Sequence, residues 1–186
     1  SVMIVGVGGQ GSLLASKLLG NVLLSRGFDV KVSEVHGMSQ RGGSVVTYVR
    51  YGDKVYSPIV SEGEADAVVS FERLEAARWL PYLKEGGRLI VNDQRIDPMP
   101  VITGAAAYPD DPLSALASYR VESADALGIA VECGSQKALN LVLLGMFSRH
   151  LPFEEAAWRD AIAACVPQKT LEVNLAAFAR GRALMG

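Results

Sequence analysis

The sequence contains little of the chemistry that a resident metal centre requires. Only two of its 186 residues are cysteines, Cys133 and Cys165, and only two are histidines, His36 and His150. Because a Cys₄ iron–sulfur or zinc site needs more thiolates than this, we expect no metal and no tightly bound cofactor in the chain. Two distant cysteines also suit a reducing compartment, which favours a cytoplasmic location.

A strong charge of either sign and a long apolar run are also missing. Lys and Arg number 18 against 20 Asp and Glu, a net charge of −2, so nothing electrostatic favours nucleic acid or a membrane surface. No apolar run reaches the roughly 20 residues that cross a bilayer. Ser1 leads directly into an apolar segment, so we expect no signal peptide and a few residues lost before it. The length predicts a single domain over residues 1–186.

A glycine-rich turn follows the first apolar run. Residues 2–5 predict a strand, and Gly6, Gly8 and Gly11 then match the spacing G-x-G-x-x-G before an apolar helix over residues 12–26. Glycines let the backbone turn sharply and approach a bound group, and a helix N-terminus favours negative charge. The same glycines can equally serve close packing of helix against sheet, so both interpretations stay open.

The chain after the second predicted strand departs from a dinucleotide-binding fold. Glu34, at the end of the strand over residues 28–35, follows Gly11 by 23 residues, near the carboxylate that binds a ribose in such folds. A crossover helix should come next. Instead a polar loop leads to a strand over residues 44–51, a turn, and a returning strand over residues 54–57. This hairpin predicts a mixed sheet.

The second half predicts a strand–helix–strand unit followed by helices. We expect strands over residues 65–71, 88–92, 101–102 and 119–122, a helix over 72–83 shortened by Pro81 and stopped by Gly86 and Gly87, and tail helices over 136–149, 153–166 and 169–184. The fold class is therefore α/β, a three-layer arrangement with a mixed sheet, a Rossmann-like start and a helical C-terminal tail.

The loop over residues 36–43 has the richest chemistry in the chain. It places His36, Ser39, Gln40 and Arg41 among glycines, and a guanidinium can bind a phosphate or carboxylate through two hydrogen bonds. A serine nucleophile with His36 as its base lacks an orienting acid other than Glu34. The loop therefore favours contact with a ligand or partner over catalysis, and a plain surface turn is the alternative.

Three segments together resemble a known enzyme family. Residues 6–11, reading Gly-Val-Gly-Gly-Gln-Gly, are similar to the start of the gamma-type subunit or domain of 2-oxoacid:ferredoxin oxidoreductases. Residues 31–45 closely resemble the second motif of the indolepyruvate branch, its beta subunit, and residues 126–145 carry a third match. In this third segment Gly134-Ser135 stands where the family often has Gly-Asn.

The resemblance implies a subunit without redox chemistry of its own. Such enzymes oxidatively decarboxylate a 2-oxoacid such as indolepyruvate, transfer the acyl group to coenzyme A and pass electrons to ferredoxin. Thiamine diphosphate, magnesium and [4Fe-4S] clusters would belong to a large alpha subunit, in a hetero-oligomer. The residues expected to contact partner or ligand are Gly6, Gly8, Gly9, Gln10, Gly11, Glu34, His36, Ser39, Gln40, Arg41, Gly42 and Gly43. The alternative is a stand-alone NAD(P)-binding protein that uses Gly6, Gly8, Gly11 and Glu34.

Overall fold

The computed structural model describes residues 1–37, 42–116 and 119–185. Its strands are β1 (Val2–Val7), β2 (Asp29–His36), β3 (Ser44–Gly52), β4 (Ala65–Ser70), β5 (Leu83–Asn92) and β6 (Arg120–Ala124). Its α-helices are α1 (Ser12–Ser25), α2 (Arg73–Arg78), α3 (Met99–Ile102), α4 (Ala126–Glu132), α5 (Leu139–Ser148), α6 (Glu155–Cys165) and α7 (Leu171–Ala183). Short 3₁₀ turns are η1 (Leu80–Tyr82), η2 (Ser114–Leu116), η3 (Gln136–Ala138) and η4 (Gln168–Thr170).

The strands form one mixed sheet in the order β2-β3-β1-β4-β5-β6. The strands β1, β4, β5 and β6 run parallel, whereas β3 is antiparallel to both of its neighbours, β1 and β2. The antiparallel β3 therefore separates β1 from β2, which would be adjacent in a dinucleotide-binding fold. The mixed sheet predicted from the sequence is confirmed.

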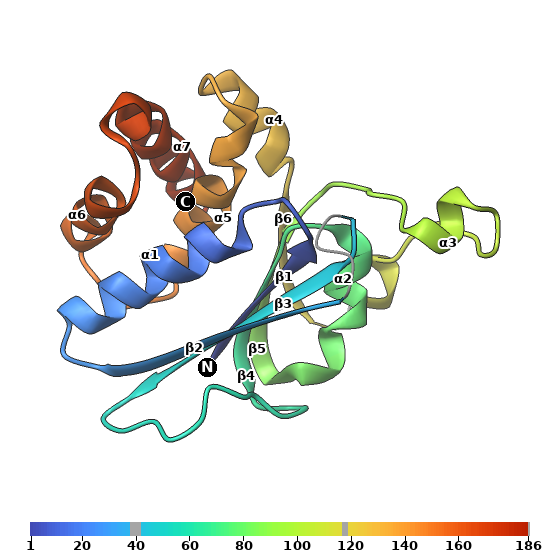
Figure 1. The fold of residues 1–186 in the computed structure, drawn as a ribbon, viewed down its shortest axis with the longest axis horizontal. Helices are drawn as coiled ribbons and strands as arrows, with labels where there is room; N and C mark the ends of the chain where they lie inside the picture. Colours follow the sequence, from blue (N-terminus) through green and yellow to red (C-terminus); the bar gives the residue numbers. More distant parts are fainter. Residues whose placement is uncertain (38–41, 117–118, 186) are drawn as a thin grey trace.

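Helices cover the two faces of the sheet unequally (Figure 1). We call the side of α1, α4, α5, α6 and α7 the helical face; the opposite side carries α2 and η1. Side chains alternate along β1, so that Val2 and Ile4 join the apolar cluster of the helical face while Met3 and Val5 join the cluster of the other. This alternation places the sheet in the middle of three layers.

Two glycines bring α5 and α7 into close contact on the helical face. A Cβ on Gly145 would lie 2.2 Å from the carbonyl oxygen of Phe178, and one on Gly181 would lie 2.0 Å from that of Val142. Every residue of α5 is buried, as expected of a helix whose side chains are apolar on nearly every side. The helix α1 is buried on its inner side, but Leu13 and Leu24 remain exposed.

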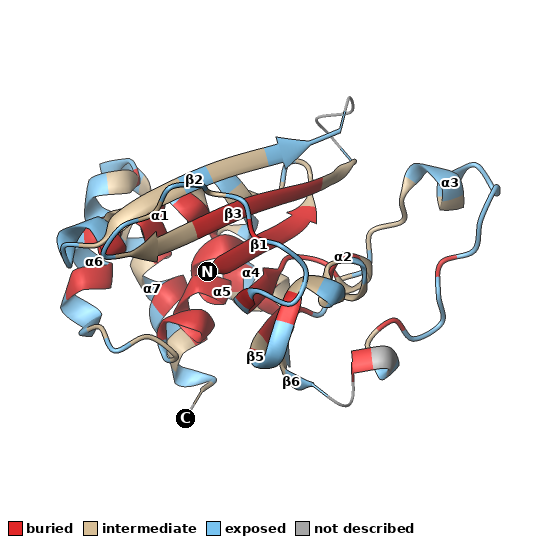
Figure 2. Cartoon of the chain, turned by 90° about the horizontal axis from the view of Figure 1, so that it is seen from below, coloured by how far each residue is buried: buried red, intermediate tan, exposed pale blue. Residues whose placement is uncertain are grey.

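A segment of the opposite face projects from the body of the molecule (Figure 2). We define this arm as residues 95–108, which include the short helix α3. The two ends of the arm meet where the Arg95 guanidinium lies over the Tyr108 ring, 4.4 Å from its centroid. Tyr108 is buried, whereas residues 102–107 are exposed.

Several predicted boundaries were wrong. In the hairpin, β3 pairs with β2. Residues 54–57 form no strand; instead, the Val55 amide donates to the Asp29 side-chain carboxylate at 2.9 Å. Residues 101–102 belong to α3. The predicted helix over 72–83 ends at Arg78, and Pro81 lies in η1 as expected of a helix breaker.

Two further differences concern β5 and α4. Gly86 and Gly87 were expected to end a helix but lie inside β5, whose register against β4 shifts between Ala65 and Ala67. The seven-residue α4 was not predicted; its Asp125 cap accepts a hydrogen bond from the Gly128 amide at 2.8 Å. Within the part of the chain that the structure describes, no helix is long and apolar enough to cross a bilayer.

Candidate functional site

The first glycine stretch, residues 6–11, connects β1 to α1 at the carboxyl end of the parallel strands. Gly9 and Gly11 have φ values of 102° and 93°, in the left-handed region that disfavours other residues. Gly11 is the N-cap of α1 and provides no side chain to satisfy the first amides of that helix. Within the described residues, the first N–H groups of α1 therefore have no capping side chain from Gly11 beside the turn.

Close packing against neighbouring side chains explains why glycine is needed at positions 6 and 11. A Cβ on Gly6 would lie 2.8 Å from Cβ of Phe71, and one on Gly11 would lie 3.0 Å from Nδ2 of Asn140. Among the described residues, no atom beyond the chain neighbours of Gly9 lies within 4 Å of a Cβ built on it. Gly6 and Gly11 are thus required by the body of the protein, whereas no described residue packs against Gly9.

Gln10 makes its hydrogen bonds inside the chain. Its Oε1 accepts from the Val7 amide at 2.7 Å, and its Nε2 donates to the Phe71 carbonyl at 3.0 Å and to Oε1 of Gln94 at 3.3 Å. The side chain therefore lies across the carboxyl ends of β1 and β4, the crevice where open α/β folds bind ligands. We predicted Gln10 as a contact to a partner or ligand, and this network gives it a second role, that of holding the turn.

Asn92 bonds to the same two groups as the Gln10 side-chain amide and so completes the network. It is fully buried at the end of β5, donates to the Phe71 carbonyl and to Gln94 at 3.0 and 2.9 Å, and accepts from the Ala126 amide at 3.0 Å. The indication in the sequence is that Gln10 follows β1 and that Asn92 and Gln94 lie at the end of β5, two strands separated in the sheet by β4.

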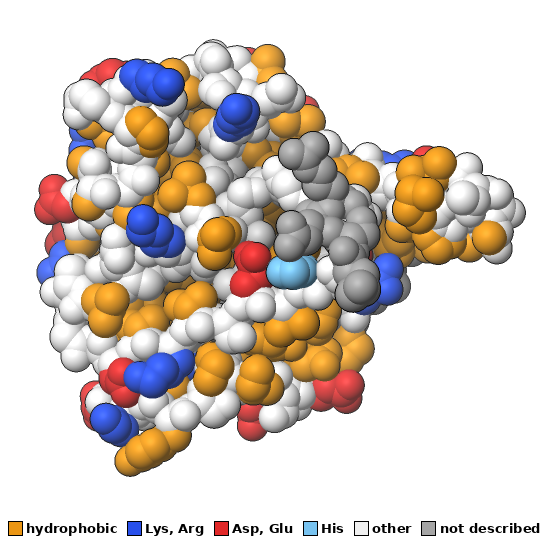
Figure 3. Space-filling view, viewed as in Figure 1, with side chains coloured by type: hydrophobic (Ala, Val, Ile, Leu, Met, Phe, Trp, Pro, Cys, Tyr) orange, Lys and Arg blue, Asp and Glu red, His pale blue; other side chains and the backbone are white. Residues whose placement is uncertain are grey.

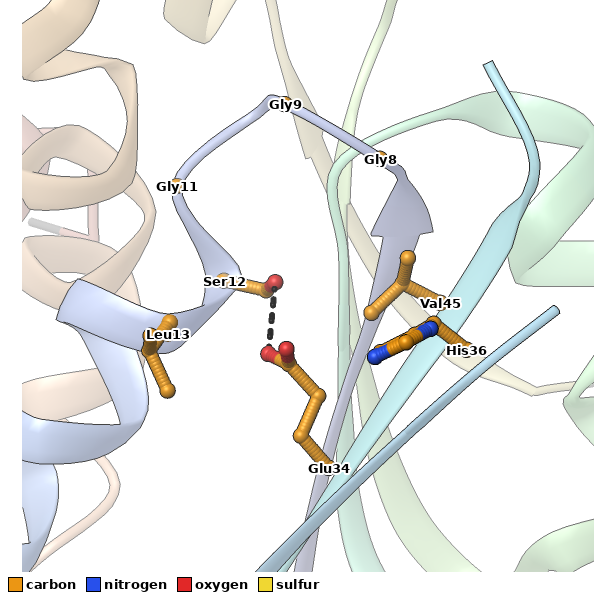
Figure 4. Close-up of a pocket in the computed structure, with 8 residues that line it drawn as sticks. All are labelled: Gly8, Gly9, Gly11, Ser12, Leu13, Glu34, His36 and Val45. Carbon is orange, nitrogen blue, oxygen red and sulfur yellow. Dashed lines mark hydrogen bonds between the residues drawn. The ribbon is translucent and has the colours of Figure 1, made fainter. Parts of the chain in front are cut away.

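Glu34 lies beside the start of α1 and not near the crevice of β1 and β4. Its carboxylate accepts from the Ser12 hydroxyl at 3.4 Å (Figure 4). It also accepts from the Thr47 hydroxyl at 3.2 Å. Thr47 is opposite Glu34 in the antiparallel ladder and is completely buried. A carboxylate so close to a helix N-terminus is favoured by the helix dipole, so Glu34 already supplies the negative charge that this end of α1 attracts.

A cleft of about 390 Å³ opens between Glu34 and the glycine turn. His36 and Val45 approach it from the sheet side (Figure 4), and His36 is exposed at the end of β2. The cleft is lined by Gly8, Gly9, Gly11, Ser12, Leu13, Glu34, His36 and Val45. It therefore combines exposed backbone amides, one carboxylate and one imidazole.

The second glycine stretch, Gly42 and Gly43 at the end of the loop over residues 36–43, is hydrogen-bonded to the first. The Gly8 amide donates to the Gly43 carbonyl at 2.9 Å, and the Gly42 amide donates to the Gly8 carbonyl at 3.4 Å. The predicted contact residues Ser39, Gln40 and Arg41 lie outside the described residues. Of the predicted set, the structure thus brings the glycines, Glu34 and His36 to one end of the sheet.

Buried carboxylates on α2 were not predicted as part of this region. Glu75 is 4% exposed and accepts from the Ser44 hydroxyl at the start of β3, from Nε of Arg78 at 3.0 Å and from Nε1 of Trp79 at 3.2 Å. It therefore fixes the residue that follows the second glycine stretch. The sequence pattern gave no signal for it, because a glutamate on a short helix usually faces solvent.

Glu72 fixes the base of the arm in the same way. This carboxylate is 1% exposed and accepts from the Tyr108 hydroxyl at 2.6 Å and the Ile96 amide at 3.1 Å. It also caps α2 through the Glu75 amide at 2.9 Å. Burial, followed by the hydrogen bond to Glu72, raises the pKa of the Tyr108 hydroxyl above its usual range, so this hydroxyl remains a donor at physiological pH.

The described residues do not fit a metal or iron–sulfur centre. Cys133 follows α4 and Cys165 ends α6, and both are unpaired thiols. Across residues 1–37, 42–116 and 119–185, no group of three or more His, Cys, Asp or Glu side chains is arranged to hold an ion. No chemical step can therefore be assigned to a metal held by these side chains.

The geometry does not support the dinucleotide-binding alternative. The strand β3 lies between β1 and β2, so Glu34 is on the outermost strand of that edge. Its carboxylate is already bonded to Ser12 and Thr47, and Gln10 lies across the crevice that a pyrophosphate would use. The spacing of 23 residues between Gly11 and Glu34 therefore reflects a different topology.

Comparison with known proteins assigns a family to this arrangement. The family model described as pyruvate ferredoxin/flavodoxin oxidoreductase matches residues 1–184. The chain is 43% identical to the indolepyruvate oxidoreductase subunit IorB of Thermococcus kodakarensis, over 97% of this chain and 93% of that protein.

Two solved structures share the fold. The gamma subunit of a keto/oxoacid ferredoxin oxidoreductase from Geobacter sulfurreducens has a TM-score of 0.74 at 22% identity, over 99% of this chain and 96% of that one. A 2-oxoglutarate:ferredoxin oxidoreductase from Magnetococcus marinus, with 2-oxoglutarate, coenzyme A and succinyl-CoA bound, has a TM-score of 0.75 at 18% identity. The match covers 99% of this chain and 30% of that longer chain.

Proposed function

Because the chain belongs to the pyruvate ferredoxin/flavodoxin oxidoreductase family, we propose that it is the small subunit of a cytoplasmic 2-oxoacid:ferredoxin oxidoreductase whose substrate is indolepyruvate or another arylpyruvate. The complex removes carbon dioxide from the 2-oxoacid, transfers the acyl group to coenzyme A and passes the electrons released to ferredoxin. The identity of 43% to an indolepyruvate oxidoreductase subunit supports the choice of substrate class.

The cofactors of this reaction belong to the partner in our proposal. A large alpha subunit carries thiamine diphosphate, magnesium and the [4Fe-4S] clusters, because the two thiols of this chain cannot hold a cluster. In the Magnetococcus marinus enzyme the same fold occupies 30% of a longer chain, which is consistent with a unit that works against other parts of a larger assembly.

The contribution of this chain is to contact the large subunit and the substrates at its two glycine stretches. The observation that carries this proposal is the pairing of Gly8 with Gly43, which joins both stretches into one surface beside the 390 Å³ cleft. Exposed backbone amides allow another chain or a ligand to approach closely. We assign hydrogen-bonding contacts to Glu34 and His36, and an anionic group of a substrate to Arg41.

Reconstitution with the large subunit from the same organism tests this function. We expect the complex, and neither chain alone, to reduce ferredoxin with indolepyruvate and coenzyme A. Arg41→Ala should raise KM for coenzyme A or the 2-oxoacid at least about tenfold, the loss of a charge-assisted contact worth roughly 1.5–3 kcal/mol. Arg26→Ala, at the exposed far end of α1, is the matched control.

Two results would count against the proposal. If the wild-type chain fails to associate with the large subunit, or if the complex is inactive with every arylpyruvate, the assigned function is wrong. If the complex is active and Arg41→Ala has the same steady-state parameters as Arg26→Ala, the anion contact is removed from the site while the function stands.

A further inference from the structure

The arm, residues 95–108, is the most prominent projection of the described chain (Figures 1 and 2). Within it α3 is held by local hydrogen bonds, including the Ile102 amide to the Pro98 carbonyl at 3.1 Å and the Thr103 amide to the Met99 carbonyl at 2.9 Å. The arm has defined local structure, although much of it lies away from the apolar clusters.

Its base is fixed by groups that are costly to bury. The carboxylate of Glu72, 1% exposed, binds the Ile96 amide at the start of the arm and the Tyr108 hydroxyl at its end. Arg95 closes the same base against the Tyr108 ring at 4.4 Å. A buried carboxylate needs such partners to be tolerated, so both ends of the arm are tied to one point of the body.

Its tip has the opposite character. Residues 98–107 contain no charged side chain, and Met99 and Ile102 are 60% and 65% exposed. Figure 3 shows hydrophobic side chains gathered on this projection. Exposed apolar side chains gathered on a projecting element are typical of a surface that another protein covers.

We propose that this tip inserts into an apolar groove of the large subunit. This inference rests on the function proposed above. The tip is continuous with the surface assigned to that subunit, because Pro98, Met99 and Pro100 line a cleft of about 270 Å³ together with Gly42 and Gly43. A partner that covers the glycine stretches therefore also reaches the arm.

Charge and preorganisation define what the groove must provide. Asp110 and Asp111 are exposed just beyond the returning end of the arm, so a basic rim beside an apolar floor would complement it. Because the base already holds the arm in place, insertion orders few additional residues and loses little conformational entropy. Apolar anchors at the centre of such a contact contribute most of its affinity.

Association of the full chain with the large subunit tests the arm. Ile102→Glu places an unpaired charge at the centre of the contact and should weaken association at least about tenfold. Tyr56→Glu is the matched control, because Tyr56 is 89% exposed and lies on the connection between β3 and β4. It should leave the dissociation constant within about twofold of wild type. The two isolated variants should melt within a degree or two of each other.

A measurement on the wild-type protein is the second part of the test. Amide hydrogen exchange in residues 101–106 should slow when the complex forms. If wild type associates, yet Ile102→Glu binds as tightly as Tyr56→Glu and exchange is unchanged, the arm proposal is overturned and the subunit assignment stands. If wild type itself does not associate, the assignment fails first. Self-association that Ile102→Glu abolishes would assign the arm to a second copy and overturn the proposal.

Discussion

The two faces of the sheet are stabilised in different ways. On the helical face, α5 and α7 approach so closely that a Cβ on Gly145 would reach the Phe178 carbonyl. On the opposite face, α2 has six residues, and the buried carboxylates Glu72 and Glu75 fix the arm and the start of β3. Apolar packing thus builds the body of the protein, while buried polar groups position the segments that carry the candidate contacts.

Substitution where α5 crosses α7 should destabilise the protein most. Gly145→Ala puts a Cβ 2.2 Å from the Phe178 carbonyl oxygen, and the two helices must separate. We expect a loss of about 3 kcal/mol or more in the free energy of unfolding, the upper range for overpacking, measured by urea denaturation. Gly20→Ala in α1 is the control, because the neighbour nearest to its Cβ among the described residues is Val32 Cγ2 at 4.0 Å. This substitution should stabilise the protein by roughly 0.5–1 kcal/mol. Equal effects of the two would contradict the close packing.

Substitution of a buried carboxylate should act on the opposite face alone. Glu72→Ala leaves the Tyr108 hydroxyl and the Ile96 and Glu75 amides without their acceptor. We expect a loss of about 2 kcal/mol and faster amide exchange in residues 95–108, with exchange in α5 and α7 unchanged. Tyr108→Phe removes one of these bonds and should cost about 1 kcal/mol. Uniform acceleration of exchange throughout the chain would show that the two faces do not behave separately.

The partly buried polar contact of Asp29 should matter least, which sharpens the distinction between fully buried and partly exposed polar groups. The hydrogen bonds from Lys31 and then from the Val55 amide lower the pKa of Asp29. In the unfolded chain the pKa of an aspartate is about 3.9. The contribution of these hydrogen bonds to stability is therefore present above that pH and is lost as pH falls through the lower pKa of folded Asp29. Asp29→Asn should therefore slightly lower stability at pH 7 and flatten its decline below pH 4. An unchanged pH profile would contradict this assignment.

The elements of the fold were largely predictable because hydrophobic periodicity is local. The strand–glycine–helix start, the strands around residues 28–51 and the apolar α5 follow directly from side-chain patterns. Pairing was harder to predict. That β3 pairs with both β1 and β2 depends on contacts between distant segments. Residues 54–57 alternate like a strand, but β3, the strand they were expected to pair with, is already paired on both sides.

The candidate site was predictable in its location but not in its internal bonding. Two glycine stretches rich in polar residues indicated one end of the sheet, where the structure places Glu34 and His36. The hydrogen bonds from Gln10 to Phe71 and Gln94 join residues 61 and 84 positions apart. Nothing in the local sequence distinguishes such an amide from one that faces solvent. The buried position of Glu75 likewise depends on β3 and α2 meeting in space.

The helical face has a consequence for the synthesis of the protein. Its apolar cluster joins Val2 and Ile4 of β1 to Trp158 and Phe178 from α6 and α7. At typical translation rates of roughly 5–20 residues per second, β1 emerges from the ribosome roughly 10–35 s before its last partners exist. During that interval the helical face is covered only by α1 and, later, by α4 and α5, which makes it the surface of this chain most open to chaperones and to aggregation.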